Sequence, residues 1–298
     1  MEFFKREMLT MTMKRRKGFI TLLMMLAVSV FATGCTTSAG SEQESTNRLE
    51  EIKERGYLEV VMEPYFAPYE FIDPSKEGVE QYVGSDVEFA KVIAEELGVE
   101  LKIIPLEFSA VLSSVTEGKY DMAISALSFT PARADAMNMS KGYYFPEGGA
   151  GHGLLIRAED VASIKGPEDI DEKVIVAQSG SLQEMFVNDQ VPDYKEFKRV
   201  SATTDGFLMV QENKADVCAA SIPMAQLYID ANPGANLMVV ENFEFYMDES
   251  TSGTRIGMPK GEDELTEEIN RIIDKVMESG EFDEWHKEYT EYAKSLGL

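Results

Sequence analysis

Apolar positions along residues 108–133 predict a short helix followed by a buried strand. The helix positions are spaced i, i+3, i+4, i+7, which puts them on one face: Phe108, Val111, Leu112 and Val115. Gly118 stands where a left-handed residue would end this helix. The nearly continuous apolar run 122–127 is typical of a strand covered on both faces in a parallel sheet.

Polar residues begin abruptly at the end of this predicted strand. They are Ser125, Ser128, Thr130 and Arg133. Open α/β sheets bind their ligands at the carboxyl ends of the strands. The sequence therefore predicts a ligand site at this edge of the sheet.

The preceding residues alternate between helix and strand patterns. The predicted elements are a helix over 47–55, a strand over 58–62, a helix over 85–97 and a strand over 99–103. Ser85 and Glu88 form an S-x-x-E capping box at the start of the longer helix. This alternation predicts a parallel α/β sheet.

A short internal sequence repeat predicts two similar lobes. Residues 117–123, EGKYDMA, are matched later by residues 212–218, ENKADVC, and each segment follows an amphipathic helix and opens a buried strand. The chain is expected to leave the first lobe through the glycine-rich residues 148–153, whose glycines can absorb the dihedral changes of a hinge. It is expected to return through residues 245–253.

The last part of the chain is predicted to complete the first lobe. Ile256 to Met258 would rejoin the first sheet, and two amphipathic helices follow. Their apolar positions are Leu265, Ile269, Ile272 and Val276 in one, and Phe282, Trp285 and Tyr289 in the other. The predicted boundaries are 47–150 with 250–298 for the first lobe and 151–249 for the second.

Residues 1–34 are predicted to be a signal peptide. A basic stretch, 14–17, precedes an apolar run over 19–32 that is too short for a comfortable membrane span. The sequence Ala-Thr-Gly-Cys at 32–35 resembles a bacterial lipobox, in which Cys35 becomes the lipidated first residue of the mature chain. The alternative is an uncleaved anchor. Residues 36–46 have almost nothing to bury and are predicted to form a flexible tether.

These features predict a protein held by lipid at the extracytoplasmic face of a bacterial membrane. Cys218 is the only other cysteine, so no internal disulfide is expected once Cys35 is lipidated. Its apolar surroundings predict a core residue.

The net charge of −25 argues against nucleic-acid binding, which requires basic surfaces. Residues 1–34 carry more basic than acidic residues, so the mature chain would be more acidic still. At 298 residues, the chain is long enough for one or two domains with ample cores.

Catalytic and cofactor patterns are scarce. The two histidines, His152 and His286, have no acidic or cysteine partner at metal-ligand spacing. There is no Walker-type loop, no G-x-S-x-G elbow and no dinucleotide fingerprint, so no cofactor is expected. The Ser-Gly-Ser sequence at 179–181 precedes a helix and is either an anion-binding loop or an ordinary helix cap.

Several ordered motifs resemble the amino-acid-receptor family of extracytoplasmic solute-binding proteins, which supply ABC importers. They are GKYDMAISALSFTPAR at 118–133, FAPYEF at 66–71, VGSDVEFA at 83–90 and QSGSLQ at 178–183. The resemblance spans about residues 47 to 295. It implies the type II periplasmic-binding-protein fold, with two α/β lobes joined by two crossover segments.

The resemblance also implies the ligand-binding residues, which are Glu63, Phe66, Phe108, Ala126, Ser128, Thr130, Arg133, Ser181, Leu182 and Ser221. Arg133 would hold the ligand carboxylate in a bidentate pair, helped by the backbone N–H groups of Ser128 and Leu182. The Ser128 hydroxyl and the Ala126 carbonyl would accept from a ligand ammonium.

The remaining implied contacts concern the ligand side chain. Phe66 and Phe108 would sandwich it, and Glu63 would reach a polar group on it. The alternative for Glu63 is a solvated carboxylate at a strand end.

The sequence departs from the family pattern at two places. Ser221 stands where relatives that bind α-amino acids carry an aspartate for the ligand ammonium, and Ser-Lys-Gly at 140–142 replaces a usual Ser-Asp-Pro. An unpaired buried ammonium is costly. Either another carboxylate, Glu63 first, takes over part of the role, or the ligand lacks a free α-ammonium.

The predicted function is non-catalytic binding of one small carboxylate-bearing solute, an amino acid by preference, and its delivery to an ABC permease by a monomer. One alternative is an enzyme resembling cyclohexadienyl dehydratase on the same fold. The other is a ligand-sensing module, although no transmembrane or kinase segment follows Leu298.

Overall fold

The computed structural model describes residues 47–146, 149, 151–248 and 252–298. The predicted signal peptide, Cys35 and the tether lie outside the described residues. Among the described helices, none is long and apolar enough to cross a membrane.

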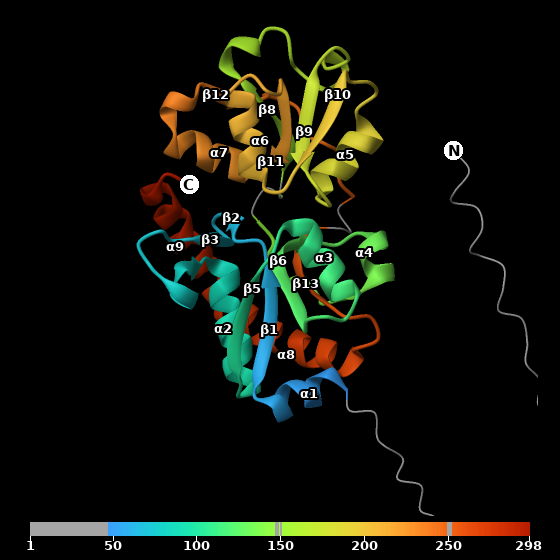
Figure 1. The fold of residues 1–298 in the computed structure, drawn as a ribbon, viewed down its shortest axis with the longest axis vertical. Coiled ribbons are helices and arrows are strands. Elements are labelled where there is room, and N and C mark those ends of the chain that lie inside the picture. Colours follow the sequence, from blue (N-terminus) through green and yellow to red (C-terminus); the bar gives the residue numbers. More distant parts are fainter. Residues whose placement is uncertain (1–46, 147–148, 150, 249–251) are drawn as a thin grey trace, which may run out of the picture. The chain divides into compact units, whose positions relative to one another are not determined.

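The first sheet has five strands in the order β5-β1-β6-β13-β7. Their bounds are β1 (Tyr57–Met62), β5 (Glu100–Pro105), β6 (Met122–Ser128), β7 (Asn138–Met139) and β13 (Thr254–Met258). β1 pairs in parallel with β5 and β6, as predicted. β13 lies beside β6 but runs antiparallel to it (Figure 1). The predictions that the alternating elements form a parallel sheet and that residues 256–258 rejoin it are confirmed, and β13 joins this sheet as an antiparallel strand.

The second sheet repeats this arrangement in the order β10-β9-β11-β8-β12. Its strands are β8 (His152–Arg157), β9 (Val174–Gln178), β10 (Glu196–Val200), β11 (Val217–Ser221) and β12 (Leu237–Val239). Three parallel strands are again followed by two antiparallel pairings. Two similar α/β lobes, each built on one sheet, are therefore present.

The internal sequence repeat places one aspartate just before the equivalent inner strand of each lobe, β6 in the first and β11 in the second. Asp121 accepts the backbone N–H of Glu59 at the neighbouring strand β1, at 2.8 Å. Asp216 accepts the backbone N–H of Val174, the first residue of β9, at 2.8 Å. Each also pairs with an arginine. The repeat therefore gives both lobes the same hydrogen bond from an aspartate to the backbone of the neighbouring strand.

Helices cover both sheets. They are α1 (Arg48–Arg55), α2 (Ser85–Leu97), α3 (Phe108–Thr116), α4 (Pro131–Ala136), α5 (Leu182–Gln190), α6 (Thr203–Gln211), α7 (Ile222–Ala231), α8 (Asp263–Ser279) and α9 (Glu281–Leu296). Short 3-10 turns occur at Gly78–Gln81, Ala158–Asp160, Pro167–Asp169 and Pro233–Ala235. A small third sheet consists of β2 (Tyr65–Phe66), β3 (Glu70–Ile72) and β4 (Tyr82–Val83).

The apolar patterns correctly predicted the buried faces of the helices. Phe108, Val111 and Val115 of α3 are buried, and Gly118 is left-handed just after its end. The predicted apolar positions of α8 are all buried in the core of the first lobe. Cys218 is buried, as predicted, and burial raises the pKa of its thiol.

The predicted capping box at Ser85 and Glu88 is wrong. Ser85 is the first residue of α2, Gly84 occupies the N-cap position, and no side chain caps the helix there. The Ser85 hydroxyl instead lies 3.1 Å from Nδ1 of His286 on α9. The Ser85 side chain therefore contacts α9 and does not cap α2.

The chain passes between the two sheets twice, because β13 returns to the first sheet after the second is complete. In the predicted first crossing, Gly149 and Gly151 have left-handed backbones, with φ of 88° and 45°. The predicted lobe boundaries near residues 150 and 250 fall on positions outside the described residues and stay predictions.

Candidate functional site

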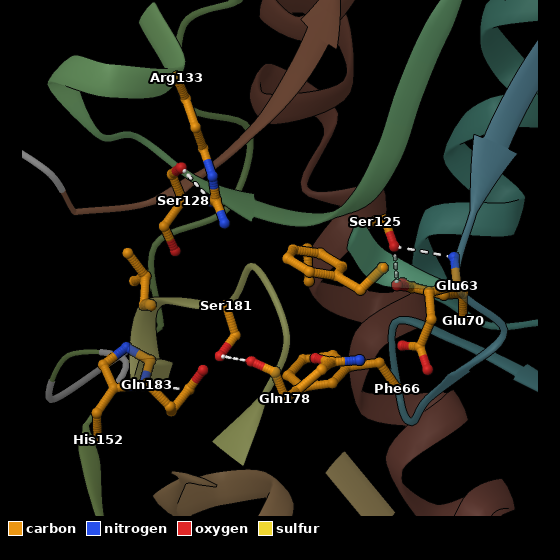
Figure 2. Close-up of a pocket in the computed structure, with 13 residues that line it drawn as sticks. Glu63, Phe66, Glu70, Ser125, Ser128, Arg133, His152, Gln178, Ser181 and Gln183 are labelled. Carbon is orange, nitrogen blue, oxygen red and sulfur yellow. Dashed lines mark hydrogen bonds between the residues drawn. The ribbon is translucent and has the colours of Figure 1, made fainter. Parts of the chain in front are cut away.

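A cavity lies between the two lobes at the carboxyl ends of β1, β6 and β9 (Figure 2). Its lining residues are Glu63, Phe66, Glu70, Phe108, Ser125, Ala126, Ser128, Arg133, His152, Gln178, Ser181, Leu182 and Gln183. The structure therefore brings together the predicted site residues with the exception of Thr130 and Ser221.

Thr130 is not among the residues that line the cavity. It is the N-cap residue of α4, and its hydroxyl accepts the backbone N–H of Arg133 at 3.1 Å. The hydroxyl of Thr130 is turned to the backbone by this cap, and the ligand-binding role expected for Thr130 stays a prediction. Thr130 positions the helix that carries Arg133.

Arg133 is a buried cation whose described partners are neutral. Its side chain donates from Nη1 to the Ser128 carbonyl at 2.8 Å and from Nη2 to the Gly180 carbonyl in the second lobe at 3.0 Å. Among the described residues, no carboxylate lies within ion-pair distance of it. Burial lowers the pKa of Arg133 to about 10, so the guanidinium stays charged at neutral pH. A buried unpaired charge is costly, so an anion at this end of the cavity would stabilise Arg133.

The loop before α5 lies against this cation. Ser181 is the N-cap of α5, and its hydroxyl accepts the Glu184 backbone N–H at 3.1 Å. Leu182, the first residue of the helix, lines the cavity. The helix-cap interpretation is confirmed, and the positive end of the helix dipole also lies at the cavity, where it favours an anion.

Two buried carboxyl groups lie on the other side of the cavity from Arg133 (Figure 2). The Ser125 hydroxyl donates to Glu70 Oε1 at 2.7 Å and accepts the Glu63 backbone N–H at 3.0 Å. Glu63 is only 1% exposed, so the alternative of a solvated carboxylate is wrong. Glu63 Oε1 and Glu70 Oε2 have no hydrogen-bond partner among the described residues.

Burial controls the protonation of both carboxyl groups. It raises the pKa of Glu63 to about 8, with a smaller contribution from the charge of Asp205. It raises the pKa of Glu70 well above its usual range, and the charge of Asp86 adds to this effect. A cation placed here would favour the ionised forms.

His152 is a further polar residue of the cavity. Only 7% of it is exposed, and its Nδ1 lies 2.9 Å from Nε2 of Gln183, while its own Nε2 has no partner among the described residues. Burial lowers the pKa of His152 to about 4, so the imidazole is neutral at neutral pH.

Ala126 lines the cavity with a strained backbone. Its φ is 45°, and its N–H donates to Asp86 Oδ2 at 2.8 Å instead of to a neighbouring strand. The pairing of β6 with β13 shifts register next to it. Bulges and left-handed alanines of this kind occur at binding sites because they redirect backbone groups.

Five lining residues were not among the predicted site residues. They are Glu70, Ser125, His152, Gln178 and Gln183. Four of them carried a signal, because Glu70, Gln178 and Gln183 belong to the family-like motifs and Ser125 belongs to the polar cluster after the apolar run. His152 was recognised only as part of the glycine-rich crossing. No group of three metal-ligating side chains occurs among the described residues.

The sequence profile of the bacterial extracellular solute-binding proteins, family 3, matches residues 58–292. The chain belongs to this family. This membership confirms the predicted family resemblance and the extracytoplasmic location, whereas the lipid anchor stays a prediction.

Relatives and solved structures similar to this family 3 protein share its fold. The arginine-binding extracellular protein ArtP of Bacillus subtilis is 25% identical over 275 residues, 89% of this chain and 96% of ArtP. A crystal structure of AbpA from Streptococcus pneumoniae, an amino acid ABC transporter substrate-binding protein bound to L-arginine, is 31% identical with a TM-score of 0.73. The match covers 82% of this chain and 98% of AbpA.

A third similar structure is an ancestral amino acid-binding protein described as a precursor of cyclohexadienyl dehydratase. Its TM-score is 0.69 at 23% identity, over 82% of this chain and all of that chain, so it shows the shared fold alone. The type II periplasmic-binding-protein fold predicted for this family 3 protein is confirmed.

Proposed function

We propose that the protein binds a small solute of amino-acid type with a cationic side chain and delivers it to an ABC importer. The observation that carries this proposal is a buried cation on one side of the cavity and, on the other, two buried acids that a solute cation would ionise. Arg133 is a buried cation without a carboxylate among its described partners, and Glu63 and Glu70 are buried acids with unpartnered oxygens. The ligands and names of AbpA and ArtP support the same solute class.

Each end of the solute has a suitable partner. The carboxylate pairs with Arg133 and the first turn of α5, and the cation lies against Glu63 and Glu70. The aliphatic stem between them packs on Phe66 and Phe108, which line the cavity from the first lobe. Arg133 already contacts Gly180 of the other lobe. The solute therefore joins the two lobes.

The direct test compares L-arginine with L-citrulline, in which a neutral urea group replaces the guanidinium at almost the same size. Isothermal titration of the purified protein should show at least about tenfold tighter binding of arginine, because a desolvated charge pair is lost in citrulline. Equal affinities would contradict a cation site at Glu63 and Glu70.

Solute binding is expected to release a proton. In the empty cavity the pKa of Glu63 is about 8, so below pH 8 this carboxyl group is protonated and neutral. A cation stabilises the ionised form and lowers the pKa, so binding below pH 8 must displace the proton. Affinity for arginine should therefore rise from pH 6 to pH 8, by up to about tenfold per pH unit, and then level off.

Titrations in two buffers of different ionisation enthalpy measure this proton release. The variant Glu63→Gln is the control and should bind arginine more weakly with a smaller pH dependence. Glu70 lines the same cavity. Any pH dependence of the arginine affinity that remains in Glu63→Gln is therefore assigned to Glu70. An affinity for arginine that is constant from pH 6 to pH 8 would disprove the protonated state of Glu63.

We propose that lipid on Cys35 holds the protein at the membrane. Cys35→Ala should abolish labelling with a radioactive fatty acid and move the protein out of the membrane fraction, because stable retention needs two acyl chains or more. Cys218→Ala is the matched control and should keep full labelling, because that thiol is buried in the second lobe. Unchanged labelling of Cys35→Ala would refute the anchor.

The protein is proposed to act as a monomer without catalysis, because one chain supplies both sides of the cavity. One observation favours the enzyme alternative: the raised pKa of Glu63 leaves a proton on an acid in the cleft. Incubation with prephenate and with arogenate tests it. Turnover of either compound would replace the receptor proposal by a dehydratase.

A further inference from the structure

A second cavity adjoins the solute cavity on the side of residue 221. Four residues line both of them, namely Phe66, Ala126, Ser128 and His152. Ser221, Pro223 and Met224 line the second cavity from the second lobe, and Tyr69 and His286 line it from the first. The two spaces therefore meet at Ser128 and Ala126, beside the position where the family resemblance places the α-nitrogen of the ligand.

The described lining of the second cavity carries no formal charge. It contains no aspartate, glutamate, lysine or arginine among the described residues. Its two histidines, His152 and His286, are neutral at neutral pH, since burial lowers the pKa of each to about 4. A solute ammonium in this second cavity would find no counter-charge in its described lining, because Asp86 is buried behind Ala126 and accepts hydrogen bonds from the Ala126 N–H and the Tyr143 hydroxyl. A buried charge of this kind is costly.

One buried polar atom at the junction, Nε2 of His152, lacks a partner among the described residues and is a hydrogen-bond donor. Nε2 of Gln183 lies 2.9 Å from Nδ1 of His152. An amide NH2 only donates, so the imidazole tautomer that fits this contact accepts at Nδ1 and carries its proton on Nε2. That Nε2–H has no partner among the described residues and is buried. An ammonium cannot accept this hydrogen bond, whereas a carbonyl oxygen can.

We propose that the α-nitrogen of the solute is acylated and that the acyl group occupies the second cavity. Its carbonyl oxygen accepts from His152 Nε2, and its amide N–H donates to the Ala126 carbonyl. A neutral amide needs one acceptor where an ammonium needs three and a counter-charge. The uncharged lining also disfavours a dipeptide, whose free N-terminus would bring the same unpaired ammonium into it.

This inference rests on the proposed function for the carboxylate and cation ends, so the experiment varies the two ends independently. The four probes are L-arginine, Nα-acetyl-L-arginine, L-citrulline and Nα-acetyl-L-citrulline, titrated into the purified chain after bound solute has been removed by unfolding and refolding. Nα-Acetyl-L-arginine should bind at least about tenfold more tightly than L-arginine, because it satisfies His152 and carries no unpaired ammonium.

The outcomes separate the two proposals. If L-arginine binds as tightly as its acetyl derivative or more tightly, the acyl site is overturned while the cation site stands. If each citrulline compound matches its arginine partner, the cation site fails, and the acetyl preference within each pair still decides the acyl site.

Ser221→Asp provides a second test. Ser221 is the N-cap residue of α7, where aspartate is accepted as well as serine, so the fold should be kept. The added carboxylate should strengthen binding of L-arginine and weaken that of its acetyl derivative, which reverses the preference. Ser221→Ala, the matched control, adds no charge and should keep the preference of the wild type. If Ser221→Asp ranks the two solutes as the wild type does, the α-nitrogen does not lie beside residue 221, and the proposal is overturned.

Discussion

Replacing Arg133 by alanine is expected to weaken solute binding by about 2 to 5 kcal/mol, the usual cost of truncating one member of a buried charged pair. The expectation follows from the partners of the side chain. They are the carbonyl oxygens of Ser128 and Gly180, and no carboxylate lies at ion-pair distance among the described residues. The carboxylate of the solute is therefore the counter-charge of Arg133, and calorimetric titration with the tightest-binding probe measures its loss.

The folded state should survive this change. The substitution removes an uncompensated buried charge but also takes one donor from the Ser128 and Gly180 carbonyls, so the two effects oppose each other and the empty variant should stay folded with a small change in unfolding temperature. Arg271→Ala is the control, because Arg271 forms exposed ion pairs with Glu96 and Glu268 and such pairs contribute at most about 1 kcal/mol. A solute affinity of Arg133→Ala within about twofold of the wild type would remove Arg133 from the site.

Local patterns predicted the helices and strands well where one face is buried. Phe108, Val111 and Val115 follow helical spacing because α3 packs against the first sheet, and the apolar run 122–127 is continuous because β6 is an inner strand. Burial of this kind imposes a period that can be read in the sequence.

Strand direction could not be predicted in this way. β13 pairs with β6 like any inner strand, but it runs antiparallel because the chain returns to it from the second lobe. The residues of β13 have the same apolar character in either direction. The direction of β13 is determined by the path of the whole chain between the two lobes.

Some residues of the cavity could be predicted from the sequence and others could not. Arg133 and Phe66 were predicted from motifs, because each belongs to a segment with several fixed positions. His152 was missed because it reaches the cavity from β8, whose sequence has no motif of its own. The buried state of Glu63 was also undecided, since it depends on packing contributed by both lobes.

A local signal also failed where a tertiary contact was stronger. Ser85 and Glu88 have the spacing of a capping box, but Gly84 takes the N-cap position of α2. The reason is the loop before it, residues 66–71, whose Tyr69 carbonyl accepts the Asp86 N–H at 2.9 Å. This close approach of two backbones leaves room for glycine alone.

Gly84→Ala is therefore expected to destabilise the protein by at least about 3 kcal/mol, from backbone strain and steric overlap together. The φ of Gly84 is 133°, a conformation that residues with a side chain rarely adopt. An added Cβ would also lie 2.1 Å from the Tyr69 carbonyl oxygen, so one of the two backbones must move. Urea unfolding followed by circular dichroism measures the change in the free energy of unfolding.

Gly98→Ala, at the other end of the same helix, is the matched control. Gly98 is also left-handed, with φ of 72°, but no atom lies within 4 Å of an added Cβ. It should cost only about 1 to 2 kcal/mol, the strain of the backbone alone. Solute binding separates the two variants further, because Gly84 supports the loop that carries Phe66 and Glu70 to the cavity, and Gly98 lies away from it. Equal urea midpoints and equal solute affinities of Gly84→Ala and Gly98→Ala would show that the contact between residue 84 and Tyr69 holds neither the fold nor the site.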